Sequence, residues 1–122
     1  MADVREYLPL SPQQFHMLLA LADGDRHGYG IILEVAERTA GAMRLGTGTL
    51  YTALARLVDS GLILESGRRP AKSRDDARRR YYRLTSLGRA VLEAEVARLE
   101  ALVEHARRTG VQPRRRSLSR TR

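Results

Sequence analysis

The segment from Gly46 to Leu84 constrains the fold most tightly, because it joins a short amphipathic helix to two strands across an arginine-rich connection. Thr47 offers a side-chain oxygen where an apolar pattern begins, and Gly61 can adopt the left-handed conformation that closes a helix. The apolar residues between them recur at helical spacing and are Leu50, Leu54, Leu57 and Val58. We therefore predict a helix between Thr47 and Gly61 with one face in a core.

The other face of this predicted helix is polar. It holds Gly48, Thr49, Tyr51, Thr52 and Arg56. Hydroxyl and guanidinium groups can reach base edges or phosphates in a DNA groove. Taken singly, Thr47 and Thr49 are equally well explained as helix caps, and Tyr51 as a residue packed at the helix edge. The DNA-binding interpretation therefore depends on the segment that comes after the helix.

Two strand-like runs come next, at 62–65 and 80–84, joined by residues 66–79. From position 68 to position 83, eight basic and two acidic side chains give a net charge of +6. The basic residues expected to face DNA are Arg68, Arg69, Lys72, Arg74, Arg78, Arg79 and Arg80. Such a run is more often a solvated loop than a binding site, but its place directly after a hydroxyl-bearing helix favours a basic wing that contacts a polyanion. This order of elements predicts a winged helix that binds DNA.

Two further helices are predicted before this segment. A capping box between Ser11 and Gln14 begins the first, and Gly24 is expected to close it. The second covers about 28–40 and has Tyr29 at its start. Tyr29 can contact DNA through its backbone or pack under the wing, and the sequence favours neither. The two helices and the following turn give a helix-turn-helix order.

A long helix is predicted after Thr85, and its apolar face needs a partner. The residues expected at a dimer interface, spaced as in a two-stranded coiled coil, are Leu92, Val96, Leu99, Leu102, Val103 and Ala106. The run is too short for periodicity to prove a coiled coil. Such a face either packs back on the first helix or pairs with another chain, and we expect a homodimer.

Composition narrows the function classes. The chain has no cysteine, which excludes disulfides and thiolate metal sites. No stretch has the character of a signal peptide or a membrane span, so we expect a cytoplasmic protein without a cofactor or a membrane partner. The net charge of +8 is uneven, with +6 in 68–83, +7 in 107–122 and −5 elsewhere. Basic charge confined to parts of the chain indicates an anionic partner that binds at those parts, such as nucleic acid.

The expected fold class is mainly α with a small β-hairpin, a winged helix-turn-helix plus a C-terminal dimerisation helix. We expect an N-terminal extension at 1–10, the DNA-binding domain at 11–85, the dimerisation helix at 86–108 and a disordered basic tail at 109–122. A solvated chain end explains the tail better than a specific role does.

Four short motifs occur one after another in a characteristic order. They are His27-Gly28-Tyr29-Gly30-Ile31, Gly48-Thr49-Leu50-Tyr51, Gly61-Leu62-Ile63, and Arg80-Tyr81-Tyr82-Arg83-Leu84-Thr85 with Gly88. In this order the chain resembles the PadR family of bacterial transcriptional regulators from Ser11 to about Arg107, in the shorter architecture with a single helix after the wing.

The resemblance implies a homodimer that inserts its recognition helices into successive major grooves of a palindromic operator. It further implies a repressor that a small-molecule or other effector releases near the dimer interface. Thr49, Tyr51 and the wing arginines fall at DNA-facing positions. Thr52 departs from the family, which often has proline there, and the chain lacks the tryptophan that drug-binding relatives use in the dimer pore.

Two other functions compete with this expectation. An RNA-binding or ribosome-associated protein would also be basic, but one phenylalanine, five tyrosines and no tryptophan offer few of the aromatic platforms on which RNA bases stack. An enzyme is disfavoured, because His16, His27 and His105 are scattered and no phosphate-cradling glycine loop is present. Sequence-specific binding of double-stranded DNA is therefore the expected function.

Overall fold

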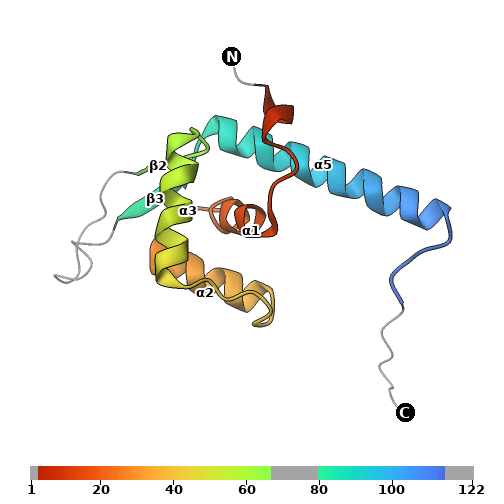
Figure 1. Ribbon diagram of the computed structural model, residues 1–122, viewed down its shortest axis with the longest axis horizontal. Helices are drawn as coiled ribbons and strands as arrows, with labels where there is room; N and C mark the ends of the chain where they lie inside the picture. The colour runs from red at the N-terminus through yellow and green to blue at the C-terminus, as the bar shows by residue number, and fades with distance from the viewer. Residues whose placement is uncertain (1–2, 67–79, 115–122) are drawn as a thin grey trace, which may run out of the picture.

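The computed structural model describes residues 3–66 and 80–114, which fold around one central helix (Figure 1). In chain order the elements are η1 (Val4–Tyr7), α1 (Pro12–Ala20), β1 (Arg26–His27), α2 (Gly28–Arg38), α3 (Thr47–Asp59), β2 (Ile63–Glu65), β3 (Tyr81–Leu84) and α5 (Ser86–Arg108). The helices α2, α3 and α5 surround α1, and the β2–β3 hairpin lies beside α3. The predicted mainly helical fold with a small β component is confirmed.

The sheet has three antiparallel strands in the order β1-β3-β2, where the sequence predicted two. In the hairpin, Ile63 lies opposite Leu84. The two-residue strand β1 pairs with the other edge of β3, and His27 lies opposite Tyr81. Two residues are too few to show the alternation that identifies a strand in a sequence. The third strand was therefore missed.

Three predicted helix boundaries are confirmed. Gln14 donates its backbone N–H to Ser11 Oγ at 3.1 Å, and Ser11 donates its own to Gln14 Oε1 at 3.0 Å. Gly88 donates its N–H to Thr85 Oγ1 at 2.9 Å, which begins α5. Gly61 has φ +82° and directly follows Ser60, the C-cap residue of α3, as expected. These bonds pair groups that a helix end leaves free.

Two other helix ends differ from the prediction. The N-cap of α3 is Gly46, which offers no side-chain acceptor, and Thr47 is the first helical residue instead of the cap. The first helix ends at Ala20, before Gly24. Its last turn tightens, because the N–H of Leu21 bonds to the carbonyl three residues back instead of four. Gly24 is in the loop that leads to β1.

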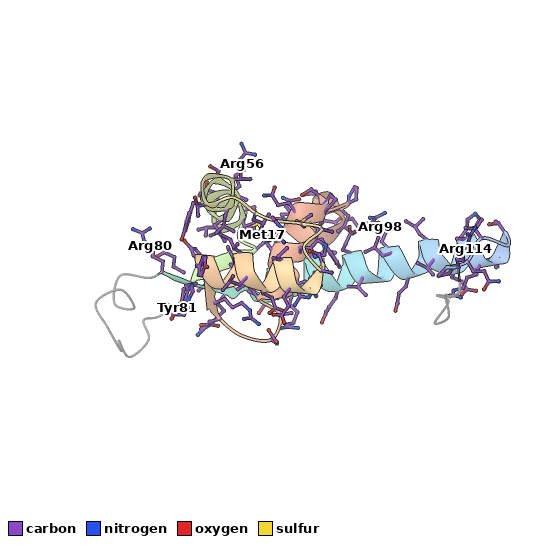
Figure 2. All side chains as sticks on the ribbon, turned by 90° about the horizontal axis from the view of Figure 1, so that it is seen from below. Met17, Arg56, Arg80, Tyr81, Arg98 and Arg114 are labelled. Atoms are coloured by element: carbon purple, nitrogen blue, oxygen red, sulfur yellow. The ribbon has the colours of Figure 1, made fainter. Side chains whose placement is uncertain are left out.

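The core forms around α1. Met17 and Leu18 have no exposed area, and Figure 2 shows Met17 between the helices. The buried residues that surround them include Ile31, Val35, Leu50, Leu54, Leu57, Leu62, Ile63, Val91 and Leu92. Val58 was predicted on the buried face of α3 but is 37% exposed. At 100° per residue it is turned to the edge of that face, toward the hairpin.

The residues before α1 are attached to both α3 and α5. Glu95 of α5 is only 2% exposed, and its Oε2 accepts the N–H of Leu10 at 3.2 Å. Arg98 donates to both oxygens of the same carboxylate, at 2.6 and 3.0 Å. Tyr7 donates its hydroxyl to the carbonyl of Ser60, at the end of α3, at 3.3 Å. The N-terminal extension is therefore part of the fold.

Candidate nucleic-acid interface

Helix α3 has one buried face and two exposed flanks that line separate grooves. Toward α1, a groove of about 410 Å³ is lined by Ser11, Gln13, Gln14, Gly48, Thr49, Thr52, Ala53 and Arg56. Toward the hairpin, a groove of about 320 Å³ is lined by Tyr51, Ala55, Val58, Asp59, Glu65, Arg80 and Tyr82. The predicted DNA-facing residues of α3 therefore fall on both sides of its exposed ridge. Thr49, Thr52 and Arg56 lie together, and Tyr51 lies apart from them.

The groove between α1 and α3 is rich in uncharged donors. Thr49 and Thr52 contribute hydroxyls from α3, and Gln13 contributes an amide from α1. Arg56 is exposed and projects outward from α3 (Figure 2). Among the described residues, no carboxylate lines this groove, so its one charge is positive. Donors of this kind complement phosphate oxygens and the acceptors on base edges.

The groove beside the hairpin has mixed charge. Arg80 Nη1 lies 3.2 Å from Glu65 Oε2, and both side chains are largely exposed. An exposed pair of this kind contributes little to stability, so a phosphate can replace Glu65 as the partner of Arg80. Burial raises the pKa of Tyr82, and Glu65 adds to the rise, so this phenol stays protonated. Asp59 adds a further carboxylate to the same groove.

Arg83, on the hairpin strand β3, is paired with a carboxylate of the same chain. Arg83 donates from Nε and Nη2 to the two carboxylate oxygens of Asp25, at 3.2 and 3.1 Å. These hydrogen bonds raise the pKa of the guanidinium, which stays charged. The pair connects β3 to the residue before β1. Arg83 was not a predicted DNA contact. Apart from Arg80, the predicted wing contacts lie outside the described residues: Arg68, Arg69, Lys72, Arg74, Arg78 and Arg79.

Two predicted contacts stand at helix starts. Three groove residues at the start of α1 were not predicted as contacts. Thr47 is exposed in the first turn of α3, and Tyr29 is 54% exposed at the start of α2. Ser11 and Gln14 were predicted only as the cap that begins a helix, yet together with Gln13 they form one wall of the groove. A capping pattern identifies where a helix begins but not what that end faces.

The two halves of α5 differ in burial. Val91 and Leu92 pack in the core of their own chain. Leu92, at 5% exposure, therefore departs from the expected dimer contacts. Val96, Leu102 and Val103 are 39%, 52% and 48% exposed. Their half of the helix projects beyond the other elements in Figure 1. The first half of α5 thus packs on its own chain, and the second half leaves an apolar face uncovered. Pairing of that second half with another chain stays a prediction.

An apolar groove lies along the uncovered half of α5. It measures about 440 Å³ and is lined by Phe15, Val96, Leu99, Glu100, Val103 and Glu104. Ala106, the last expected contact, is half-buried. Within 3–66 and 80–114, no cluster of three or more histidine or acidic side chains could hold a metal. In the same described part of the chain, no helix combines the length and the apolar character needed to cross a membrane.

Comparison with known proteins identifies the family. Residues 17–94 match the transcriptional regulator PadR-like family. An uncharacterized 37.1 kDa protein in transposon TN4556 of Streptomyces fradiae is 43% identical over 93 residues, which are 74% of this chain and 24% of that protein. The chain thus spans about a quarter of the length of that relative.

Solved structures show the same fold. A PadR family transcription regulator from Clostridium difficile R20291 has a TM-score of 0.66 and 28% identity, over 80% of this chain and 97% of that chain. Bacillus subtilis PadR in complex with operator DNA has a TM-score of 0.59 and 19% identity, over 93% of this chain and 53% of that chain. At 19% identity, the similarity to Bacillus subtilis PadR shows a shared fold only.

The family match begins within α1 and ends within α5, so it includes α3, the hairpin strands and the groove between them. Of the groove toward α1 it includes only the α3 wall, because Ser11, Gln13 and Gln14 precede residue 17. The family is one of transcriptional regulators and not of enzymes, in agreement with the sequence-based expectation. The winged helix-turn-helix interpretation of the fold is likewise confirmed. The chain therefore belongs to the PadR-like family of transcriptional regulators.

Proposed function

We propose that this protein is a homodimeric regulator that binds specific sequences of double-stranded DNA through α3 and the hairpin. The observation that carries this proposal is the groove beside α3, where hydroxyls, amides and Arg56 meet without a lining carboxylate. A helix that exposes small polar side chains can enter the major groove and reach base edges. The fold shared with a PadR protein solved on its operator also supports the proposal.

The proposed contacts divide between bases and phosphates. Thr49 and Thr52 are short, so they reach base edges only if the backbone of α3 lies close to the DNA. Gly48 favours a close approach, because its position has nothing within 4 Å of an added methyl and no side chain of its own. Arg56 holds a phosphate, and Arg80 does so once it leaves Glu65. The basic residues of 68–79, which lie outside the described residues, add charge that binds the phosphate backbone without regard to sequence.

The site is completed by a second copy of the chain. The proposed contacts lie on the exposed half of α5 and are Val96, Leu99, Leu102, Val103 and Ala106. Pairing along this half removes apolar area from water, and the helix offers no other cover for it within the described residues. A twofold dimer presents two copies of α3 to a palindromic operator, with half-sites about one helical turn apart.

The regulatory outcome we propose is repression in the cytoplasm, relieved by a small-molecule or other effector. Support comes from the family and from the apolar groove beside Phe15, whose lining includes the proposed dimer contacts Val96, Leu99 and Val103. An effector bound next to the contacts between the two chains would favour one relative position of the two α3 helices. DNA affinity would then depend on effector occupancy, and effector affinity on DNA.

Selection of bound duplexes from a random DNA pool tests this function. We expect enrichment of a palindrome whose half-sites are centred about 10 base pairs apart, and weaker retention of structured RNA at the same salt concentration. Failure to enrich any motif, or preferential retention of the RNA, would contradict the proposal. The RNA result would favour the alternative of an RNA-binding or ribosome-associated protein.

A further inference from the structure

Gly28, the first residue of α2, lies beneath the ring of Tyr51 from α3. A Cβ atom added at Gly28 would stand 2.6 Å from Tyr51 Oη, 2.9 Å from Tyr51 Cζ and 3.1 Å from Leu50 Cδ2. The first two distances are shorter than van der Waals contact allows, so the ring can occupy its place only if position 28 has no side chain. We propose that Gly28 is a positioning residue that sets where α3 presents the Tyr51 phenol.

The contact joins the two helices of the helix-turn-helix at one point. Gly28 is buried, while Tyr51 is 50% exposed and lines the groove beside the hairpin together with Arg80. The hydroxyl end of the ring therefore lies against α2, while about half of the side chain is exposed at the groove. Contact with Gly28 sets the position of the hydroxyl. This inference rests on the proposed function, in which that groove faces DNA.

A methyl group at Gly28 would move the phenol and leave the fold intact. Gly28 begins a helix, where alanine is favourable, and its φ lies outside the left-handed region that would strain another residue. Leu50, in the core, needs to yield by only a few tenths of an ångström. The half-exposed ring of Tyr51 can rotate outward into solvent, so it is the group that gives way. The expected effect is therefore on binding, not on folding.

The matched control is Gly30→Ala, on the same helix two residues on. An added Cβ there would lie 3.5 Å from His27 Cε1, an ordinary contact. The probe is a duplex selected from a random pool by the parent protein. We expect Gly28→Ala to weaken binding of this duplex by about tenfold, the scale of one lost base contact. We expect Gly30→Ala to bind within twofold of the parent, and both variants to melt within a few degrees of it.

A double-mutant cycle separates positioning from a general structural effect. If Gly28 acts through the phenol, Gly28→Ala causes no further loss of affinity in a Tyr51→Ala background. Independent losses that multiply, or parental binding by Gly28→Ala alone, would overturn the inference.

A readout without DNA keeps this inference distinct from the proposed function. In protein labelled with ¹³C at tyrosine rings, the Tyr51 signals should shift in Gly28→Ala and stay in place in Gly30→Ala. If the Tyr51 signals do not move in Gly28→Ala, Gly28 does not position the Tyr51 ring and the inference is wrong. If the parent protein selects no duplex while the signals move as expected, the positioning of Tyr51 by Gly28 is supported and the proposed DNA-binding function is wrong.

Discussion

At the scale of single residues, Glu95 connects parts of the chain that are distant in sequence. Its carboxylate accepts the Leu10 N–H, two residues before α1 begins, and the guanidinium of Arg98. The Arg98 hydrogen bonds are the largest influence on this group and hold the pKa of Glu95 below its ordinary value, against the effect of burial. Since Ser11 follows Leu10 and lines the groove at α3, the carboxylate also supports one wall of the proposed interface.

The lowered pKa of Glu95 predicts a pH dependence of stability. Because the folded pKa lies below the unfolded value of about 4.3, the carboxylate stabilises the fold above that value, and its contribution is lost as the pH falls through the folded pKa. We expect Glu95→Gln to lower the free energy of unfolding at pH 7 by about 1–3 kcal/mol. The difference from the parent should shrink toward pH 3, as measured by urea denaturation.

Glu104→Gln is the matched control for this measurement. Glu104 also pairs with an arginine of α5, Arg108, at 3.4 Å, but both side chains are 62% exposed. Its loss should change stability by less than about 0.5 kcal/mol. Equal effects of the two substitutions, or a Glu95→Gln deficit that does not depend on pH, would show that the carboxylate of Glu95 lacks the proposed role.

At the scale of elements, the start of α5 rests directly on the chain that enters β2. Thr85 donates its N–H to the Leu62 carbonyl at 3.1 Å and its hydroxyl to the Gly61 carbonyl at 2.7 Å. Gly88, one turn into the helix, lies against the same Leu62 carbonyl and is buried. This close approach sets how α5, and with it the proposed dimer contact, is placed relative to α3 and the hairpin.

Gly88→Ala should therefore destabilise the fold severely. The added methyl would overlap the Leu62 carbonyl oxygen and lie 2.9 Å from Leu84 Cδ1, so the helix must move. We expect a loss of about 3 kcal/mol or more in the free energy of unfolding. Gly48→Ala on α3, which has nothing within 4 Å of the added methyl, should instead gain about 0.5–1 kcal/mol. Parental stability of Gly88→Ala would contradict this packing of α5 on Leu62.

The elements also show which features a sequence reveals. The caps of α1 and α5 are short-range patterns, because each side chain bonds within three residues, and they were predicted correctly. The α3 cap failed because Gly46 leaves no side-chain signal. The ion pair between Asp25 and Arg83 joins residues 58 positions apart. The strand β1 likewise depends on pairing with β3, far along the chain, and no local pattern encodes either contact. For the same reason the α1 wall of the groove was missed.

At the scale of the whole molecule, the proposed DNA contacts and the proposed dimer contacts lie apart along its length. Arg56 and Arg80 lie at the end of the molecule that carries α3 and the hairpin, and the uncovered half of α5 extends the other way (Figure 2). A dimer formed along α5 would therefore leave both α3 grooves free. Within the described residues, the expected contacts of α5 lie C-terminal to Leu92, because Leu92 is already buried in its own chain.

Val103→Asp should separate the two chains. A carboxylate at the centre of the proposed contact would lose hydration on pairing and disfavour the dimer. We expect a monomer in sedimentation equilibrium at micromolar concentration, and operator binding weaker by at least about tenfold. Val111→Asp is the control, because Val111 is 64% exposed and lies beyond the end of α5. A dimeric Val103→Asp protein would place the interface elsewhere.

The number of chains on one duplex tests the central claim most directly. With a labelled palindromic duplex selected by the protein, sedimentation velocity at low ionic strength should show two chains per duplex. A duplex with a single half-site should bind far more weakly, because the second α3 then loses its specific contacts. One chain bound per palindrome with undiminished affinity for the half-site, or no complex with any duplex, would contradict the account.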